Sequence, residues 1–265
     1  MVIKDQGIDN LMGFATEVIR RTGEQALSFY GKGNPELKFD EVLVTEAELQ
    51  LRESFQAELY ARFPEHQVYG NSRGNEGYTH EGKRYLWVYD CLDGVANFQA
   101  GIPIWGMSLG LVENFWPLLG LFYMPVTGDL FFAQAGQKAF RGKEAIRVSR
   151  QETINDESLL LTFSRFHHQF RAAFPGKIRD LGCTTAHLCY VAMGRAEAAV
   201  VANESYQDLA GVSIIIEAAG GGLFKMDGSE FFLNDYLEGQ RVEEPLLAVA
   251  PDKCVEVRAC LKDGF

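Results

Sequence analysis

Two carboxylates lie three residues apart at the end of an apolar run, in the segment Asp90-Cys91-Leu92-Asp93-Gly94. Carboxylates that converge in this way repel each other unless a cation lies between them. Hard cations such as Mg²⁺ take carboxylate oxygens as ligands and keep coordination positions open for a phosphate. The segment also fits a strand followed by an Asx turn, in which Asp93 bonds the loop backbone and Gly94 supplies a positive φ.

A third acid, Asp208, lies far downstream at the start of a strongly apolar helical segment. Taken alone, it fits an N-cap or a favourable charge–dipole position. Together with Asp90 and Asp93, it predicts a cation site that the backbone carbonyl of Leu92 could also face. Gly94 and the residues after it could present backbone N–H groups to a phosphate at a helix start.

The residue pattern around these acids predicts two helices and then antiparallel strands in the first half of the chain. One helix contains Ile8 to Ile19 at helical spacing and is interrupted at Gly23, and a second starts at the capping box Thr45-Glu46-Ala47-Glu48 and ends at Pro64. Strands are expected at 67–70, 85–89, 104–112, 117–123 and 130–133.

The second half of the chain alternates strands with helices. Strands are expected at 158–163, 178–180, 196–201 and 246–250, and helices at 165–174, 184–193, 208–219 and 252–261, with Gly220-Gly221-Gly222 closing the third of these helices. The pattern indicates an α/β (α+β layered) fold in one domain, 1–265, with an antiparallel-rich first half (about 1–150) and an α/β second half (about 151–265).

The composition excludes several classes of protein. With a formal net charge of −11, a general nucleic-acid binder is not expected, although a local positive pocket is compatible with this charge. The five cysteines form no CxxC pair, which argues against zinc or a disulfide framework and favours a reducing cytoplasm. No signal-peptide pattern and no apolar run of membrane-spanning length is present, so no membrane association is expected.

Two segments carry a resemblance to a known family. Trp87 to Phe98 resembles the W-x-x-D-P-[IL]-D-G-T-x-N-F signature of the inositol monophosphatase family, and Gln207–Gly211 with Glu217–Gly221 resembles its second signature, W-D-x-A-A-G-x-x-I-x-x-E-A-G-G. Further matches are at 44–48, 101–112 and 142–149, so the resemblance covers nearly the whole chain. It implies an αβαβα sandwich, a Mg²⁺ requirement, a small phosphorylated ligand and a homodimer.

The resemblance assigns roles residue by residue. Asp90, Asp93 and Asp208 match the ligands of one metal position, and Leu92 matches a backbone-carbonyl ligand of another. The residues expected to bind phosphate or substrate lie in two short loops, Gly94, Val95, Ala96 and Gly182, Cys183, Thr184.

The chain departs from the family pattern on the side that activates water. The family's G-E-E-S is Gly70-Asn71-Ser72-Arg73 here, which removes two carboxylates and adds a cation. Glu76 could substitute as an acid. Val95 replaces a threonine that helps to hold the nucleophilic water, and the loss of one such hydrogen bond lowers a rate on the order of 10²-fold. Glu48 replaces an aspartate and could serve in catalysis or in the Thr45 capping box.

Other positions point away from efficient inositol phosphate recognition or have structural interpretations. Val201 occupies a position where the family has an acid that contacts inositol hydroxyls. Cys91 is expected to be a packed thiol. Trp105, Phe115 and Trp116 fit core or dimer-surface positions on strands.

Two hypotheses follow. The first is a Mg²⁺-dependent phosphomonoesterase with at most one well-formed Mg²⁺ site and weak or altered activity. The alternative is a non-catalytic member, a possible pseudoenzyme, that binds a metal or a phosphorylated ligand in a regulatory role.

Overall fold

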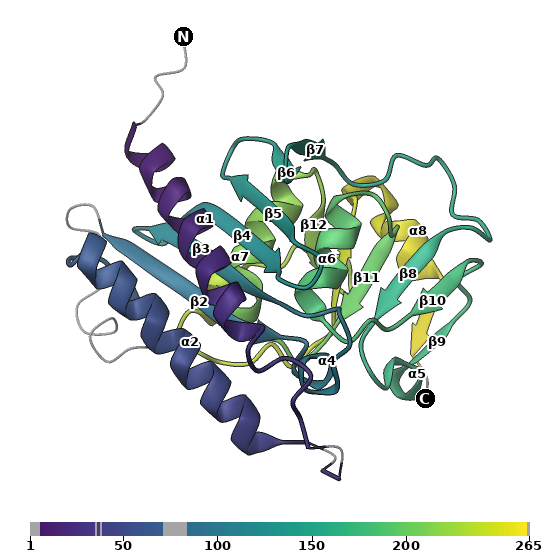
Figure 1. Ribbon diagram of the computed structural model, residues 1–265. Coiled ribbons are helices and arrows are strands. Elements are labelled where there is room, and N and C mark those ends of the chain that lie inside the picture. Colours follow the sequence, from purple (N-terminus) through teal and green to yellow (C-terminus); the bar gives the residue numbers. More distant parts are fainter. Residues whose placement is uncertain (1–5, 35, 38, 71–83, 264–265) are drawn as a thin grey trace.

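The computed structural model describes residues 6–34, 36–37, 39–70 and 84–263 (Figure 1). It has two large sheets. The first has seven strands in the order β1-β2-β3-β4-β5-β6-β7, and the second has five in the order β10-β8-β11-β13-β12. Helices cover the outer faces and fill the space between the sheets (Figure 1). The predicted αβαβα sandwich is therefore confirmed.

Two long helices, α1 (Gln6–Ala26) and α2 (Glu41–Arg62), cover the outer face of the first sheet. Helix α1 continues through Gly23, where an interruption was expected. A side chain at Gly23 would lie 2.7 Å from the Tyr123 ring, so close packing requires glycine there. Helix α2 begins earlier than predicted, since the Asp40 carboxylate accepts from Leu43 N at 3.0 Å and caps it. Thr45 is inside the helix, so the predicted capping box is wrong. None of the helices in the described ranges combines the length and apolar character needed to cross a membrane.

The first sheet begins with strand β1 parallel to β2 and continues antiparallel. Its strands are β1 (Gln67–Val68), β2 (Tyr85–Asp93), β3 (Gly106–Glu113), β4 (Trp116–Met124), β5 (Asp129–Gln134), β6 (Ala139–Arg141) and β7 (Glu144–Ile146). In β2, Trp87, Tyr89 and Cys91 pack toward α1 and α2, whereas Leu86 and Val88 pack on the opposite face. Burial on both faces explains why β2 is a continuous apolar run.

Helices α6 (Thr184–Ala192) and α7 (Tyr206–Ala218) form the middle layer. Helix α7 lies directly on the first sheet, because glycines face it there: a side chain at Gly120 would lie 2.0 Å from the Gly211 carbonyl oxygen. The second sheet packs on the other side of this layer and consists of β8 (Leu159–Thr162), β10 (Lys177–Arg179), β11 (Ala198–Val201), β12 (Gly222–Lys225) and β13 (Leu246–Val249).

The outer layer of the second half differs most from prediction. The helix expected at 165–174 is only α5 (Phe166–Gln169), followed by strand β9 (Phe170–Ala172). The terminal helix expected at 252–261 is the 3-10 turn η2 (Pro251–Lys253) with α8 (Cys254–Ala259), followed by β14 (Leu261–Asp263). Strands β9 and β14 pair antiparallel. That long-range pairing overrides the local helical preference. Strand β12 was not predicted at all.

Candidate active site

A β-bulge shapes the end of β2. Asp90 pairs with Ser108, but Asp93 pairs with Gly106, so β2 holds one extra residue between these two pairs. Gly94 then turns the chain into helix α4 (Val95–Ala100) with φ of 83°. A side chain at Gly94 would lie 3.0 Å from the Ile104 carbonyl oxygen, so both the positive φ and the close packing require glycine. The bulge and the turn thereby place both acids at one sheet end.

Asp90 is the most buried of the three predicted acids, with 9% of its surface exposed. Its Oδ1 accepts a hydrogen bond from Leu92 N at 3.3 Å. Burial raises the pKa of Asp90 well above its usual range, and the charges of Asp93 and Asp208 raise it further. The three predicted acids therefore act on one another electrostatically.

Asp93 caps helix α6 from a different part of the chain. Its Oδ1 accepts from Thr184 N at 3.3 Å and its Oδ2 accepts from Thr185 N at 2.5 Å. The helix has no side-chain cap from its own N-cap residue, Cys183. A carboxylate at this position satisfies free N–H groups and complements the helix dipole. The positive φ predicted for Gly94 is therefore confirmed. The Asp93 carboxylate, which was predicted to bond the backbone of its own loop, accepts hydrogen bonds from the backbone of α6.

Asp208 is the third residue of α7 and belongs to a capping box. Its Oδ2 accepts from Ser205 N at 2.7 Å, and Ser205 Oγ accepts from Asp208 N at 3.4 Å. The N-cap is therefore Ser205 and not Asp208, which corrects that interpretation. Burial raises the pKa of Asp208, although the hydrogen bonds with Ser205 partly oppose this.

A fourth acid, Glu204, joins this group and was missed by the sequence analysis. It is 8% exposed, and its Oε1 accepts from Thr184 Oγ1 at 2.9 Å. Burial raises its pKa well above the usual range, and the charges of Asp93 and Asp208 add to the effect. The feature of the sequence that could have identified Glu204 is an acid in the loop between β11 and α7. The family resemblance instead assigned the acid position to Val201, which is a buried core residue of β11.

Asn97 fastens the two predicted phosphate loops together. Its Nδ2 donates to the carbonyl oxygens of Ile104 (2.6 Å) and Leu181 (2.7 Å). A side chain at Gly182, whose φ is 74°, would lie 2.9 Å from this amide. The loop at 94–96 and the loop at 182–184 are therefore neighbours, as the resemblance implied. Asn97 is in the first signature segment, but the sequence analysis gave it no role.

We name Asp90, Asp93, Asp208 and Glu204 the acidic group. The positions of the remaining predicted residues are as follows. Glu48 is half-buried on α2, with Oε2 3.7 Å from Arg52 Nη2. The Cys91 thiol contacts the Glu48 carbonyl oxygen at 3.9 Å, and burial raises its pKa to about 12, as expected of a packed thiol. Val95 is partly buried and packs against the hydrophobic core between the first sheet and helices α1 and α2. The predicted positions Asn71, Ser72, Arg73 and Glu76 lie outside the described residues.

The donor chemistry of the acidic group fits a hard cation. Asp90 and Glu204 are buried among other acids that raise their pKa values, and a cation between them would remove this repulsion. Within the described ranges, however, no three Asp, Glu, His or Cys side chains are arranged as a set that could hold a metal ion. Asp93 and Asp208 bond backbone amides instead.

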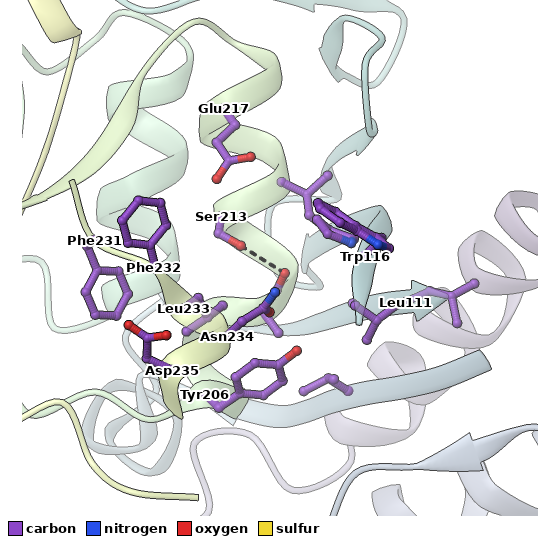
Figure 2. A pocket seen from close by; sticks show the side chains of 16 residues that line it. Leu111, Trp116, Tyr206, Ser213, Glu217, Phe231, Phe232, Leu233, Asn234 and Asp235 are labelled. Carbon is purple, nitrogen blue, oxygen red and sulfur yellow. Dashed lines mark hydrogen bonds between the residues drawn. The ribbon is translucent and has the colours of Figure 1, made fainter. Parts of the chain in front are cut away.

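A separate, mainly apolar cavity of about 430 Å³ lies beside α7, near the 3-10 turn η1 (Leu233–Tyr236) (Figure 2). Figure 2 shows Trp116 on one side, Phe232 on the other and Tyr206 near the start of α7. Trp116 is 73% exposed, whereas Trp105 is buried in the core, so the predicted aromatic group is divided between surface and core. None of the four acids lines this cavity.

Comparisons with known proteins agree with the fold and the signatures. A sequence profile of the Inositol monophosphatase family matches residues 8–250. The fructose-1,6-bisphosphatase/inositol-1-monophosphatase of Aquifex aeolicus is 27% identical over 236 residues, which are 85% of this chain and 88% of that protein. Inositol monophosphatase 3 of Solanum lycopersicum is 30% identical over 244 residues, 85% of this chain and 90% of that protein.

Solved structures share the layered architecture. The Thermotoga maritima IMPase has a TM-score of 0.74 at 23% identity and covers 94% of this chain and 97% of its own. The suhB protein of Bartonella henselae has a TM-score of 0.75 at 21% identity, with the same coverage. At these identities the structures establish the fold class, a layered sandwich of helices and sheets. With the profile match, the chain belongs to the inositol monophosphatase family.

Proposed function

We propose that this protein is a Mg²⁺-dependent phosphomonoester hydrolase scaffold with weak or altered activity. The observation that carries the proposal is the gathering of Asp90, Asp93 and Asp208 at the end of β2, where Asp90 is buried and its pKa is raised by the other two acids. A bound cation is the simplest way to neutralise such a group at neutral pH.

In this proposal, Asp90, Asp93 and Asp208 hold one Mg²⁺, with the Leu92 carbonyl oxygen as a further ligand. The ion would activate a water molecule and stabilise the leaving oxygen. The backbone N–H groups at 94–96 and 182–184 would bind the phosphate. Asn97 keeps these two loops together through its bonds to Ile104 and Leu181.

Two features of the chain support low turnover. Val95 places a hydrocarbon side chain where the family has the water-positioning threonine, and Asn71 and Ser72 replace acids. Furthermore, both Asp93 oxygens already accept backbone hydrogen bonds from α6, so a cation must share their remaining lone pairs. The same features favour the alternative, a non-catalytic member that binds a metal or a phosphorylated ligand in a regulatory role.

Membership of the family supports a small phosphorylated molecule as the substrate class. A Staphylococcus aureus relative has been solved as an inositol monophosphate-bound IMPase, which is consistent with a small phosphorylated ligand for this chain. Glu204 adds a carboxylate beside the site that could accept hydrogen bonds from ligand hydroxyls. A homodimer and a cytoplasmic location remain parts of the proposal.

The test is turnover of a panel of phosphomonoesters with Mg²⁺, combined with calorimetric titration of Mg²⁺ and Mn²⁺. We expect metal binding, and turnover on the order of 10²-fold or more below that of members with intact motifs. Asp93→Asn should abolish both signals, while Asp156→Asn, an exposed acid outside the site, should leave them unchanged. The double variant Asn71→Glu with Val95→Thr should raise activity.

Absence of metal binding at millimolar concentration would reject the metal site. Robust wild-type turnover that is lost in Asp93→Asn would reject the weak-activity and non-catalytic interpretations. If metal binds but the repaired double variant gains nothing, the regulatory alternative is favoured.

A further inference from the structure

An arginine-rich cavity of about 550 Å³ lies between the β6–β7 hairpin, the segment that follows it and the end of α6. Arginine is its commonest lining residue, at Arg141, Arg147, Arg150 and Arg195, and Glu144 is the acid among the lining residues. The chain as a whole carries a net charge of −11, so this concentration of positive charge departs from the rest of the molecule. We name it the arginine pocket.

Most of the charge in the arginine pocket is unpaired. Arg141 is bonded to Asp129, with Nε at 2.9 Å and Nη2 at 2.8 Å from Asp129 Oδ1. By contrast, the side chains of Arg147, Arg150 and Arg195 form no ion pair or hydrogen bond with any part of the chain that the structure describes. Three guanidinium groups thus line one concavity with their donors available.

The backbone that carries these arginines is fixed. Gly194 has φ of 68°, and a side chain there would lie 3.0 Å from the Arg147 carbonyl oxygen and 3.2 Å from Ser149 N. The segment is also tied to the end of α7, because Val148 N donates to the Ala219 carbonyl oxygen at 3.0 Å. Beneath it, Ser149 Oγ donates to the buried Glu197 carboxylate at 2.8 Å. A fixed backbone reduces the entropy lost when a ligand binds.

The lining decides which anion fits. A guanidinium group binds phosphate through paired, charge-assisted hydrogen bonds, and several such groups favour a ligand with several phosphates. The apolar part of the lining is aliphatic (Ile146, Val148, Met193), and none of the described lining residues is an aromatic ring on which a base could stack. We propose that the arginine pocket binds a small anion that carries two or more phosphate groups.

This site is separate from the acidic site. Helix α6 touches Asp93 through the N–H groups of Thr184 and Thr185 at its start, whereas Met193, Gly194 and Arg195 at its end line the arginine pocket. The matched segment at 142–149 supplies Arg147 and Ser149, for which the proposed phosphatase chemistry has no role. The inference therefore does not depend on catalysis.

The test is isothermal titration of the full chain with sodium triphosphate in EDTA, so that cation-dependent binding at the acidic site does not contribute. We expect saturable binding of triphosphate that is tighter than binding of orthophosphate and weakens with added salt. The double variant Arg147→Ala with Arg195→Ala should weaken it at least about tenfold. The matched control, Arg171→Ala with Lys262→Ala, removes two exposed charges from the β9–β14 pair and should change affinity less than about twofold.

Further measurements separate the alternatives. Arg147→Lys with Arg195→Lys keeps the charge but removes the paired donors, so it should bind with intermediate affinity, and Asp93→Asn should bind like the wild type. The proposal is overturned by no triphosphate binding at millimolar concentration, by equal loss in the control, or by loss in Asp93→Asn. Binding of a short single-stranded RNA through these arginines without triphosphate binding would also overturn it.

Discussion

The two ends of helix α6 differ in both the sign of their charges and the way those charges are held. At its start, Asp90 and Glu204 are buried beside Asp93 and Asp208, and their pKa values are raised. At its end, the arginine pocket exposes the guanidinium groups of Arg147, Arg150 and Arg195, which have no ion-pair or hydrogen-bond partner within the described residues. Buried like charges destabilise the fold until they are protonated or neutralised. Exposed ones remain charged because water screens them.

The acidic site and the arginine pocket are therefore coupled to the stability of the fold in different ways. The acidic site is built into the packing between β2, α4, α6 and α7, so changes there should alter stability as well as ligand binding. The side chains of Arg147, Arg150 and Arg195 are exposed on a fixed backbone and form no ion pair or hydrogen bond within the described residues. Changes to them should alter ligand binding and leave stability nearly unchanged.

The largest expected effect is on stability at the acidic end. Asn97→Ala leaves the carbonyl oxygens of Ile104 and Leu181 without their amide donor, and each lost bond to a buried group costs about 1–3 kcal/mol. We expect the free energy of unfolding, measured in urea, to fall by roughly 2–5 kcal/mol. Arg195→Ala at the other end of α6 should change it by less than about 0.5 kcal/mol. Equal losses in the two variants would contradict the comparison.

The acidic end should make a pH-dependent contribution to stability through Glu204. Because the pKa of Glu204 is raised by folding, the folded state binds more protons between its unfolded and folded pKa values. The contribution of Glu204 to the free energy of unfolding of the metal-free protein should therefore fall as pH rises above about 4.3 through the folded pKa. Glu204→Gln keeps an acceptor for Thr184, removes the charge and should be more stable than the wild type at pH 8 by roughly 1–3 kcal/mol.

Urea unfolding in EDTA between pH 5 and pH 8 checks this prediction. Glu53→Gln, an exposed substitution on α2, should follow the wild-type curve. Added Mg²⁺ should reduce the difference in free energy of unfolding between the wild type and Glu204→Gln if a cation neutralises the acidic group. A difference in the free energy of unfolding between Glu204→Gln and the wild type that does not grow with pH, or a Glu204→Gln variant less stable than the wild type at pH 8, would show that another contact dominates at Glu204.

Local sequence signals pointed to three of the four acids, Asp90, Asp93 and Asp208, whose charges act on one another. The acids of β2 follow an apolar run, and Asp208 opens an apolar helix, so both could be placed without knowledge of the rest of the chain. Glu204 and Asn97 could not be found in this way. The role of Glu204 depends on Thr184 from another element, and that of Asn97 on the carbonyl groups of two distant loops.

The fold shows the same division between local and distant causes. The long helices and strands β1 to β5 of the first sheet were predicted from their local residue patterns, whereas the short strands β6 and β7 were not predicted. Strand β9 was predicted as helix, and the helix predicted at 252–261 ran into the first residue of β14, because only the pairing of β9 with β14 makes them strands. The start of α2 was misplaced because Thr45 and Glu48 have capping-box spacing inside a helix that Asp40 caps. The arginine pocket was compatible with the composition, yet its members come from two separate segments.

The smallest expected effect tests whether releasing a paired guanidinium group strengthens ligand binding by the arginine pocket. Arg141 is held by Asp129 in a partly exposed ion pair, and fully exposed ion pairs are worth about 0.2–1 kcal/mol. Asp129→Asn should release Arg141 for the ligand and strengthen triphosphate binding by about two- to fivefold. Glu157→Gln releases Lys177 from a similar exposed pair on the second sheet and should change nothing. Weaker binding in Asp129→Asn would mean that the ion pair holds Arg141 in the position that the ligand needs.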